Sequence, residues 1–202
     1  VHGDDHILPT RDRLVEEDHR ERSERMADST MRVIRLVGLG FIIPLVLSMV
    51  VYFGFVSSYT VGVFSEAGFR AQYETGIYKY RVLGQITLLE IHEIIERSGL
   101  PVIAPPGMFL LDRNGNPSFY MAYFLNNTLF LCLTCSVLML LFEKLSPPGS
   151  VWIGDLLVVL LCLLMTITQY IVVPYDTMAC FFLCLAFALS FDDYVVTVFN
   201  SG

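Results

Sequence analysis

Four long apolar stretches, separated by polar segments, dominate the pattern of this chain. They cover residues 33–57, 119–142, 151–173 and 177–191. A helix that crosses a bilayer needs about 20 predominantly apolar residues, and the first three stretches reach that length. The fourth is shorter, at roughly 15 residues, and would need flanking residues, a thinner bilayer or a protein neighbour to cross. The pattern predicts an all-α membrane protein with about four transmembrane helices, and the hydrophobic share of 54% agrees.

Arginine residues before the first apolar stretch predict the orientation of the chain. Six of them lie in residues 1–32, and Arg35 stands at the predicted membrane edge. Cytoplasmic segments close to a span carry an excess of Lys and Arg. The N-terminus is therefore predicted to be cytoplasmic, as in a bacterial-type plasma membrane. Alternation then places loop 58–118 outside and the tail, residues 192–202, in the cytoplasm.

The leader, residues 1–32, is rich in charge and poor in apolar residues. Glu and Arg four residues apart would support a solvated helix. Such a helix would have no apolar face to bury, so the leader is predicted to be largely disordered.

Loop 58–118 is too polar to cross a membrane and too aromatic for a free linker. Residues 81–97 are predicted to form a juxtamembrane helix that ends before Gly99. Apolar residues spread around most of its circumference, which predicts packing against protein or the membrane surface. Asn116 and Pro117 predict the start of the second span, with proline at its first helical position.

Charge and composition exclude several functions. The net charge of −7, without a basic stripe, argues against nucleic-acid binding. The five cysteines all lie in predicted spans, where hydrocarbon excludes metal ions and thiolates, so we expect them to be packing residues. No acidic or basic side chain is expected inside the bundle of spans, which argues against a transporter or proton relay. His92 is expected on a solvated face of helix 81–97.

One short motif in the outer loop brings a family resemblance. The sequence Gly76-x-Tyr78-x-Tyr80-Arg81, behind a first span and ahead of a juxtamembrane helix, resembles the opening of GT-C-type glycosyltransferases. These polytopic membrane enzymes take sugars from polyprenyl-phosphate donors at the outer membrane face. By topology the resemblance covers residues 33–191, and the later Pro-Tyr-Asp turn adds to it. Family members usually carry Asp, where this chain has Glu, behind the first span.

The resemblance implies one catalytic carboxylate in each of two outer loops. The candidates are Glu66 and Glu74 in the first loop and Asp176 in the second. One carboxylate would act as general base toward an acceptor hydroxyl, and acidic groups would hold a divalent metal ion against the donor phosphate. The candidate phosphate-binding residues are Arg70, Lys79 and Arg81.

A non-catalytic accessory subunit of a larger membrane complex is the alternative. Four spans, a short fourth helix and a structured outer loop suit a protein that packs against larger partners. On this alternative the Tyr- and Arg-rich stretch anchors the loop at the interface, and Asp176 caps the fourth helix. The expected partners are thus membrane lipids together with either a polyprenyl-phosphate sugar or other membrane subunits.

Overall fold

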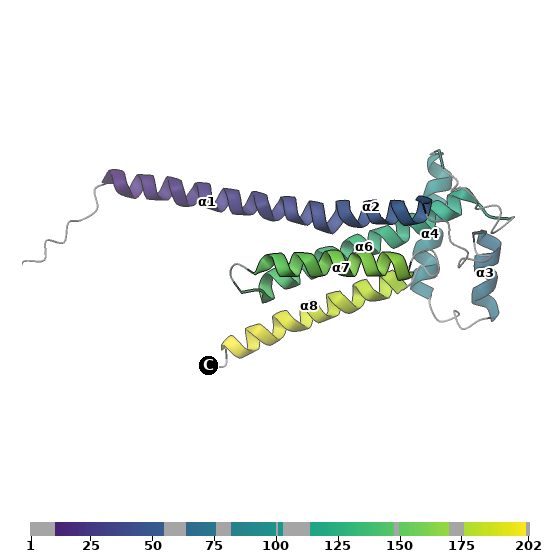
Figure 1. The fold of residues 1–202 in the computed structure, drawn as a ribbon. Helices are drawn as coiled ribbons and strands as arrows, with labels where there is room; N and C mark the ends of the chain where they lie inside the picture. The colour runs from purple at the N-terminus through teal and green to yellow at the C-terminus, as the bar shows by residue number, and fades with distance from the viewer. Residues whose placement is uncertain are drawn as a thin grey trace, which may run out of the picture.

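The predicted all-α class is confirmed by a computed structural model of the chain (Figure 1). The structure describes residues 11–54, 64–75, 82–99, 101–102, 114–147, 150–169 and 176–200. Its elements in these ranges are helices joined by short turns, and none of the described residues forms a strand.

The first helical run begins inside the charged leader. Helix α1 (Arg11–Val37) continues into a π-helical turn η1 (Gly38–Ile42), then α2 (Ile43–Met49) and a second π-helical turn η2 (Val50–Gly54). Residues 11–32 are therefore helical, whereas the sequence predicted disorder. A helix that the apolar segment has nucleated gains one hydrogen bond for each further residue, which makes extension into the leader cheap. An exposed ion pair, Arg20 Nε to Glu24 Oε1 at 2.9 Å, supports this extension.

Helix α6 (Pro117–Leu145) is the central element of the bundle. It contacts η1, α2, α7 (Val151–Gln169) and α8 (Asp176–Asn200), and Figure 1 shows α6, α7 and α8 running alongside one another. Its start agrees with the sequence, because Asn116 is the N-cap and Pro117 is the first helical residue. The core between α6 and α7 consists of Leu131, Cys135, Met139, Val158, Cys162 and Met165. These two cysteines and Cys132 are buried, in keeping with a packing role.

Two glycines allow α6 to approach its neighbours closely. A Cβ at Gly40 would lie 2.7 Å from Ser136 Oγ, and one at Gly154 would lie 2.7 Å from Phe142 Cβ. Neither distance leaves room for a side chain. The close packing of η1 and of α7 against α6 therefore depends on these glycines.

Two further helices cover the N-terminal end of α6 (Figure 1). They are α3 (Glu66–Thr75) and α4 (Val82–Ser98). Helix α4 lies within one residue of the predicted helix 81–97, whereas α3 was not foreseen. Ser65 begins α3 by accepting the Gly68 N–H at its Oγ, 3.3 Å away. The core at this end is mostly aromatic, with Tyr52, Phe64, Phe69, Phe119, Tyr120, Tyr123 and Phe124.

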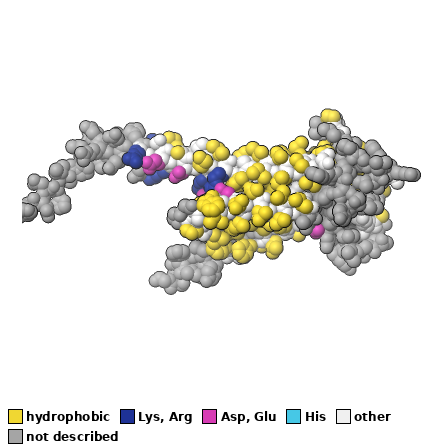
Figure 2. All heavy atoms as spheres, in the orientation of Figure 1, with side chains coloured by type: hydrophobic (Ala, Val, Ile, Leu, Met, Phe, Trp, Pro, Cys, Tyr) yellow, Lys and Arg dark blue, Asp and Glu magenta, His cyan; other side chains and the backbone are white. Residues whose placement is uncertain are grey.

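Apolar side chains cover much of the bundle surface between its two ends (Figure 2). Two helical runs, Arg22–Gly54 and Pro117–Leu145, are long and apolar enough to cross a membrane. The apolar parts of the other two, Val151–Ile167 and Asp176–Phe191, are shorter. Length and composition thus favour a membrane protein, and the count of four spans stays a prediction.

An acidic side chain, Asp155, lies within the predicted span 151–173, contrary to the expectation that the spans hold none. It lies in the second turn of α7, and its two oxygens meet Arg35 on α1, with Nε–Oδ2 at 3.0 Å and Nη2–Oδ1 at 2.5 Å. Both side chains are 24% exposed. Arg32 and Glu143 form a second pair close by, at 2.6 Å. The bidentate geometry compensates the carboxylate in its apolar surroundings, and the pairs join the first helix to α7 and α6.

Candidate functional site

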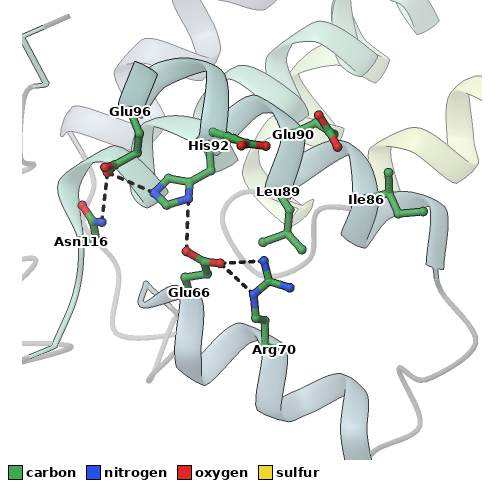
Figure 3. Close-up of a pocket in the computed structure, with 9 residues that line it drawn as sticks. Glu66, Arg70, Ile86, Leu89, Glu90, His92, Glu96 and Asn116 are labelled. Carbon is green, nitrogen blue, oxygen red and sulfur yellow. Dashed lines mark hydrogen bonds and ion pairs between the residues drawn. The ribbon is translucent and has the colours of Figure 1, made fainter. Parts of the chain in front are cut away.

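An open cleft lies between α3 and α4, at the end of the bundle where α6 begins (Figure 3). Its volume is about 600 Å³. It is lined by Glu66, Arg70, Ile86, Leu89, Glu90, His92, Glu93, Glu96 and Asn116. Four of these nine side chains are carboxylates, so the cleft is strongly acidic for its size.

Packing against α6 determines which residues of α3 and α4 reach the cleft. On α4, Leu88, His92 and Ile95 are buried and share one helical face at spacings of four and three. On α3, Phe69 is 1% exposed and packs edge-to-face on Phe119, with ring centroids 5.4 Å apart. With these faces turned inward, Glu66 and the glutamates of α4 face the space between the two helices.

His92 stands at the junction of three helices. Its side chain is 8% exposed, and its ring packs edge-to-face on Phe119 at 5.0 Å. Nδ1 lies 3.6 Å from Glu66 Oε2 on α3, and Nε2 lies 3.1 Å from Ser118 Oγ on α6. Glu96 Oε1 is 3.4 Å from Nε2. The prediction that His92 lies on a solvated face is therefore wrong. Its spacing from Leu88 and Ile95 was the signal for a buried position.

The first turn of α6 organises the other side of the histidine. The Oδ1 of Asn116 accepts the Ser118 N–H at 2.9 Å, and the Ser118 hydroxyl donates to Glu96 Oε1. Asn116 Nδ2 reaches the same carboxylate at 3.5 Å. The hydrogen bonds from Ser118 and Asn116 lower the pKa of Glu96 below its usual value. Glu96 therefore holds its charge beside the ring at neutral pH.

Of the predicted site residues, the structure brings two together in the cleft. Arg70 donates to Glu66 Oε1 from Nε and from Nη2, at 2.7 Å each (Figure 3). Glu74 belongs to α3, but its side chain lies outside the described residues. Lys79 and Arg81 lie wholly outside them.

Asp176, the third predicted carboxylate, begins α8 and does not line the cleft. The next residue, Thr177, donates to Asn127 Oδ1 on α6 at 3.1 Å. Asn127 lies nine residues beyond Ser118, which is about 14 Å along the helix axis. Asp176 stands at the positive end of its helix dipole, as a residue with a structural role would. Convergence of Asp176 with the first-loop carboxylates stays a prediction.

Metal binding finds no support in the part of the chain that is described. No three His, Cys, Asp or Glu side chains in those ranges are placed to hold a metal ion. The described lining of the cleft thus does not fit the divalent ion that the resemblance suggested, and none of the chemistry below depends on one.

Comparison of the chain with protein-family models, curated proteins and solved structures finds no match. What the cleft can do must therefore follow from its own groups. A carboxylate and an imidazole at 3.6 Å in an open cleft can accept the proton of a hydroxyl group. Arg70 can pair with an anion at the edge of the cleft.

Proposed function

We propose that this chain is a multi-pass integral membrane protein whose cleft acts as a GT-C-like glycosyl-transfer site. The site would act on a polyprenyl-phosphate-linked sugar at the outer membrane face. One observation carries the proposal: the first carboxylate after the first span, Glu66, lines an open cleft between a histidine and an arginine. A carboxylate at this place in the chain is what the resemblance requires.

The dimensions of the bundle support a membrane setting. Glu143, in the ion pair with Arg32, lies 27 residues along α6 from Asn116 at the cleft, about 40 Å at the rise of an α-helix. That length matches a bilayer with its headgroups, about 40–45 Å. The surface between these ends is largely apolar, including exposed residues of α2, α7 and α8 (Figure 2). Lipid chains would cover such a surface without a free-energy penalty, because both are apolar.

The arginines support one orientation of the two ends relative to the membrane. Arg32 and Arg35 lie at the end opposite the cleft, and the positive-inside tendency assigns that end to the cytoplasm. The cleft would then face outward, where polyprenyl-linked sugars are used. Both chain termini would be cytoplasmic.

This orientation predicts opposite labelling of two exposed positions. In intact cells an Asn114→Cys variant is expected to react with a membrane-impermeant maleimide. A Lys144→Cys variant is expected to react only after permeabilisation. Both native residues are exposed, and wild-type protein controls for the native cysteines, which are buried or half-buried. Labelling with the two sites exchanged would reverse the assignment of the faces.

Within the cleft, Glu66 would accept a hydrogen bond from the acceptor hydroxyl as that oxygen attacks the sugar. Four carboxylates line the cleft. Their negative charge favours binding of the neutral acceptor hydroxyl there and disfavours binding of the anionic donor phosphate. The donor phosphate would therefore approach from the rim, where Arg70 can exchange Glu66 for a phosphate oxygen. That exchange would leave Glu66 free for the acceptor. Lys79, Arg81 and Asp176 remain candidates for the donor side.

The experiment is a transfer assay with the purified protein in lipid nanodiscs. A labelled polyprenyl-phosphate sugar and a panel of hydroxyl acceptors are supplied, and the protein alone is expected to form a glycosylated product. Protein-free nanodiscs control for spontaneous hydrolysis. Failure of transfer, with recovery of the chain only in a stoichiometric complex with other membrane proteins, would establish the accessory-subunit alternative instead.

A further inference from the structure

The hydrogen bonds around His92 determine which of its nitrogens carries a proton. The Ser118 hydroxyl has one hydrogen and two neighbouring acceptors, Glu96 Oε1 and Asn116 Oδ1. The oxygen of the Asn116 amide is identified because it accepts a backbone N–H. The hydroxyl hydrogen therefore points to one of these acceptors, and its lone pairs face His92 Nε2 at 3.1 Å. With the hydroxyl hydrogen on either acceptor, and with Glu96 Oε1 also 3.4 Å away, Nε2 is assigned as the N–H of the ring.

With the proton assigned to Nε2, Nδ1 is the ring nitrogen that can gain or lose a proton. In the neutral imidazole Nδ1 is a lone pair that faces Glu66 Oε2, and two acceptors then oppose each other at 3.6 Å. The arrangement becomes favourable when a proton or a donor hydroxyl enters. A hydroxyl oxygen about 2.8 Å from both atoms would complete a compact triangle with them.

The chemistry of the two groups decides where the proton goes. An imidazole is ordinarily a stronger base than a carboxylate. The imidazolium that forms would lie between two carboxylates, Glu66 from α3 and Glu96 from α4. At the start of α6, the polar group that contacts the ring is the uncharged Ser118 hydroxyl, which also contacts Asn116.

We propose that His92 is the catalytic residue that takes the acceptor's hydroxyl proton, at Nδ1, while Glu66 orients the hydroxyl and stabilises the imidazolium. This inference rests on the proposed glycosyl transfer. The acceptor O–H bond breaks and its proton moves to Nδ1. The oxygen keeps the electron pair and bonds to the anomeric carbon of the donor sugar. The bond from that carbon to the phosphate oxygen breaks, and the polyprenyl phosphate leaves with those electrons.

Ser118, Asn116 and Glu96 act as positioning residues in this scheme. They hold the proton on Nε2 and thereby keep the basic lone pair of Nδ1 directed at the cleft. This is the arrangement that a histidine base needs, with one nitrogen tied to a fixed partner and the other open to the substrate.

The first test needs no substitution. A base must be unprotonated to accept the hydroxyl proton, so wild-type transfer is expected to fall when acid protonates the His92 ring. ¹⁵N NMR of histidine-labelled protein is expected to show Nε2 of His92 protonated throughout. Nδ1 should gain a proton at the pH where the rate falls. A ring in which Nε2 is the unprotonated nitrogen would overturn the proposal.

The second test compares His92→Gln with His19→Gln, a matched control on α1. The first change is expected to lower transfer by about 10²–10⁴-fold and to remove the acid limb of the pH profile, whereas the control keeps both. Thermal unfolding of each variant shows whether it is folded. Active wild-type protein with an acid limb that survives His92→Gln would refute the inference alone. Inactive wild-type protein would refute the proposed function itself.

Discussion

Replacing Glu66 by glutamine is expected to lower the rate of sugar transfer by about 10²–10⁴-fold, the usual contribution of a positioned acid–base group. Glutamine keeps the size of the side chain and can still accept a bond from Arg70. It removes the negative charge that faces His92 Nδ1 at 3.6 Å. A base that must become an imidazolium loses the group that would stabilise its charge. Initial rates with saturating donor and acceptor measure the effect.

Glu24 supplies the matched control. Like Glu66 it pairs with an arginine four residues away on one helix, Arg20 Nε–Oε1 at 2.9 Å, but it lies on the exposed leader. Glu24→Gln is expected to leave the rate within twofold, since exposed pairs of this kind contribute about 0.3–0.5 kcal/mol. Full activity of Glu66→Gln would remove the cleft as the catalytic site. A large loss of transfer activity in Asp176→Asn alone would then assign the catalytic carboxylate to the start of α8.

The second large effect concerns stability. Phe119→Ala is expected to destabilise the protein by about 3–5 kcal/mol, the range for truncating a fully buried phenylalanine. The Phe119 ring is 0% exposed and contacts Phe69, His92 and Tyr123 at centroid distances of 5.4, 5.0 and 5.3 Å. Its loss removes the surface on which α3 docks. Hydrogen exchange should therefore accelerate first in residues 66–75, before the rest of the bundle responds.

Phe187 on α8 is the control for that substitution. It is 59% exposed, so alanine there removes little buried surface. We expect the midpoint of thermal unfolding in detergent to change by far less than for Phe119→Ala. An equal fall in the unfolding midpoint of the two variants would mean that the aromatic core at the cleft end contributes no more to stability than an exposed phenylalanine. Exchange in 66–75 that stays slow in Phe119→Ala would show that other contacts hold α3.

Structural features that depend only on residues close together in the sequence were predictable. Asn116 and Pro117 mark the start of α6 because a capping side chain and a residue without an N–H suit the first turn of any helix. Ser98 and Gly99 mark the end of α4, and Gly99 has a φ of 61°, in the region that glycine adopts without strain. The apolar stretches gave the helical class for the same reason, since helical hydrogen bonds are local.

The sequence by itself thus determined the helical class, the apolar segments and several helix ends, and it named Glu66 and Arg70 among the candidate site residues. Only the tertiary structure decided that His92 stands between Glu66 and Glu96, and that Arg35 meets Asp155 across 120 residues of sequence. The physical reason is that both depend on which faces of distant helices pack together. Aromatic packing on α6 turns α3 and α4 toward each other, and that packing joins residues that no local pattern connects.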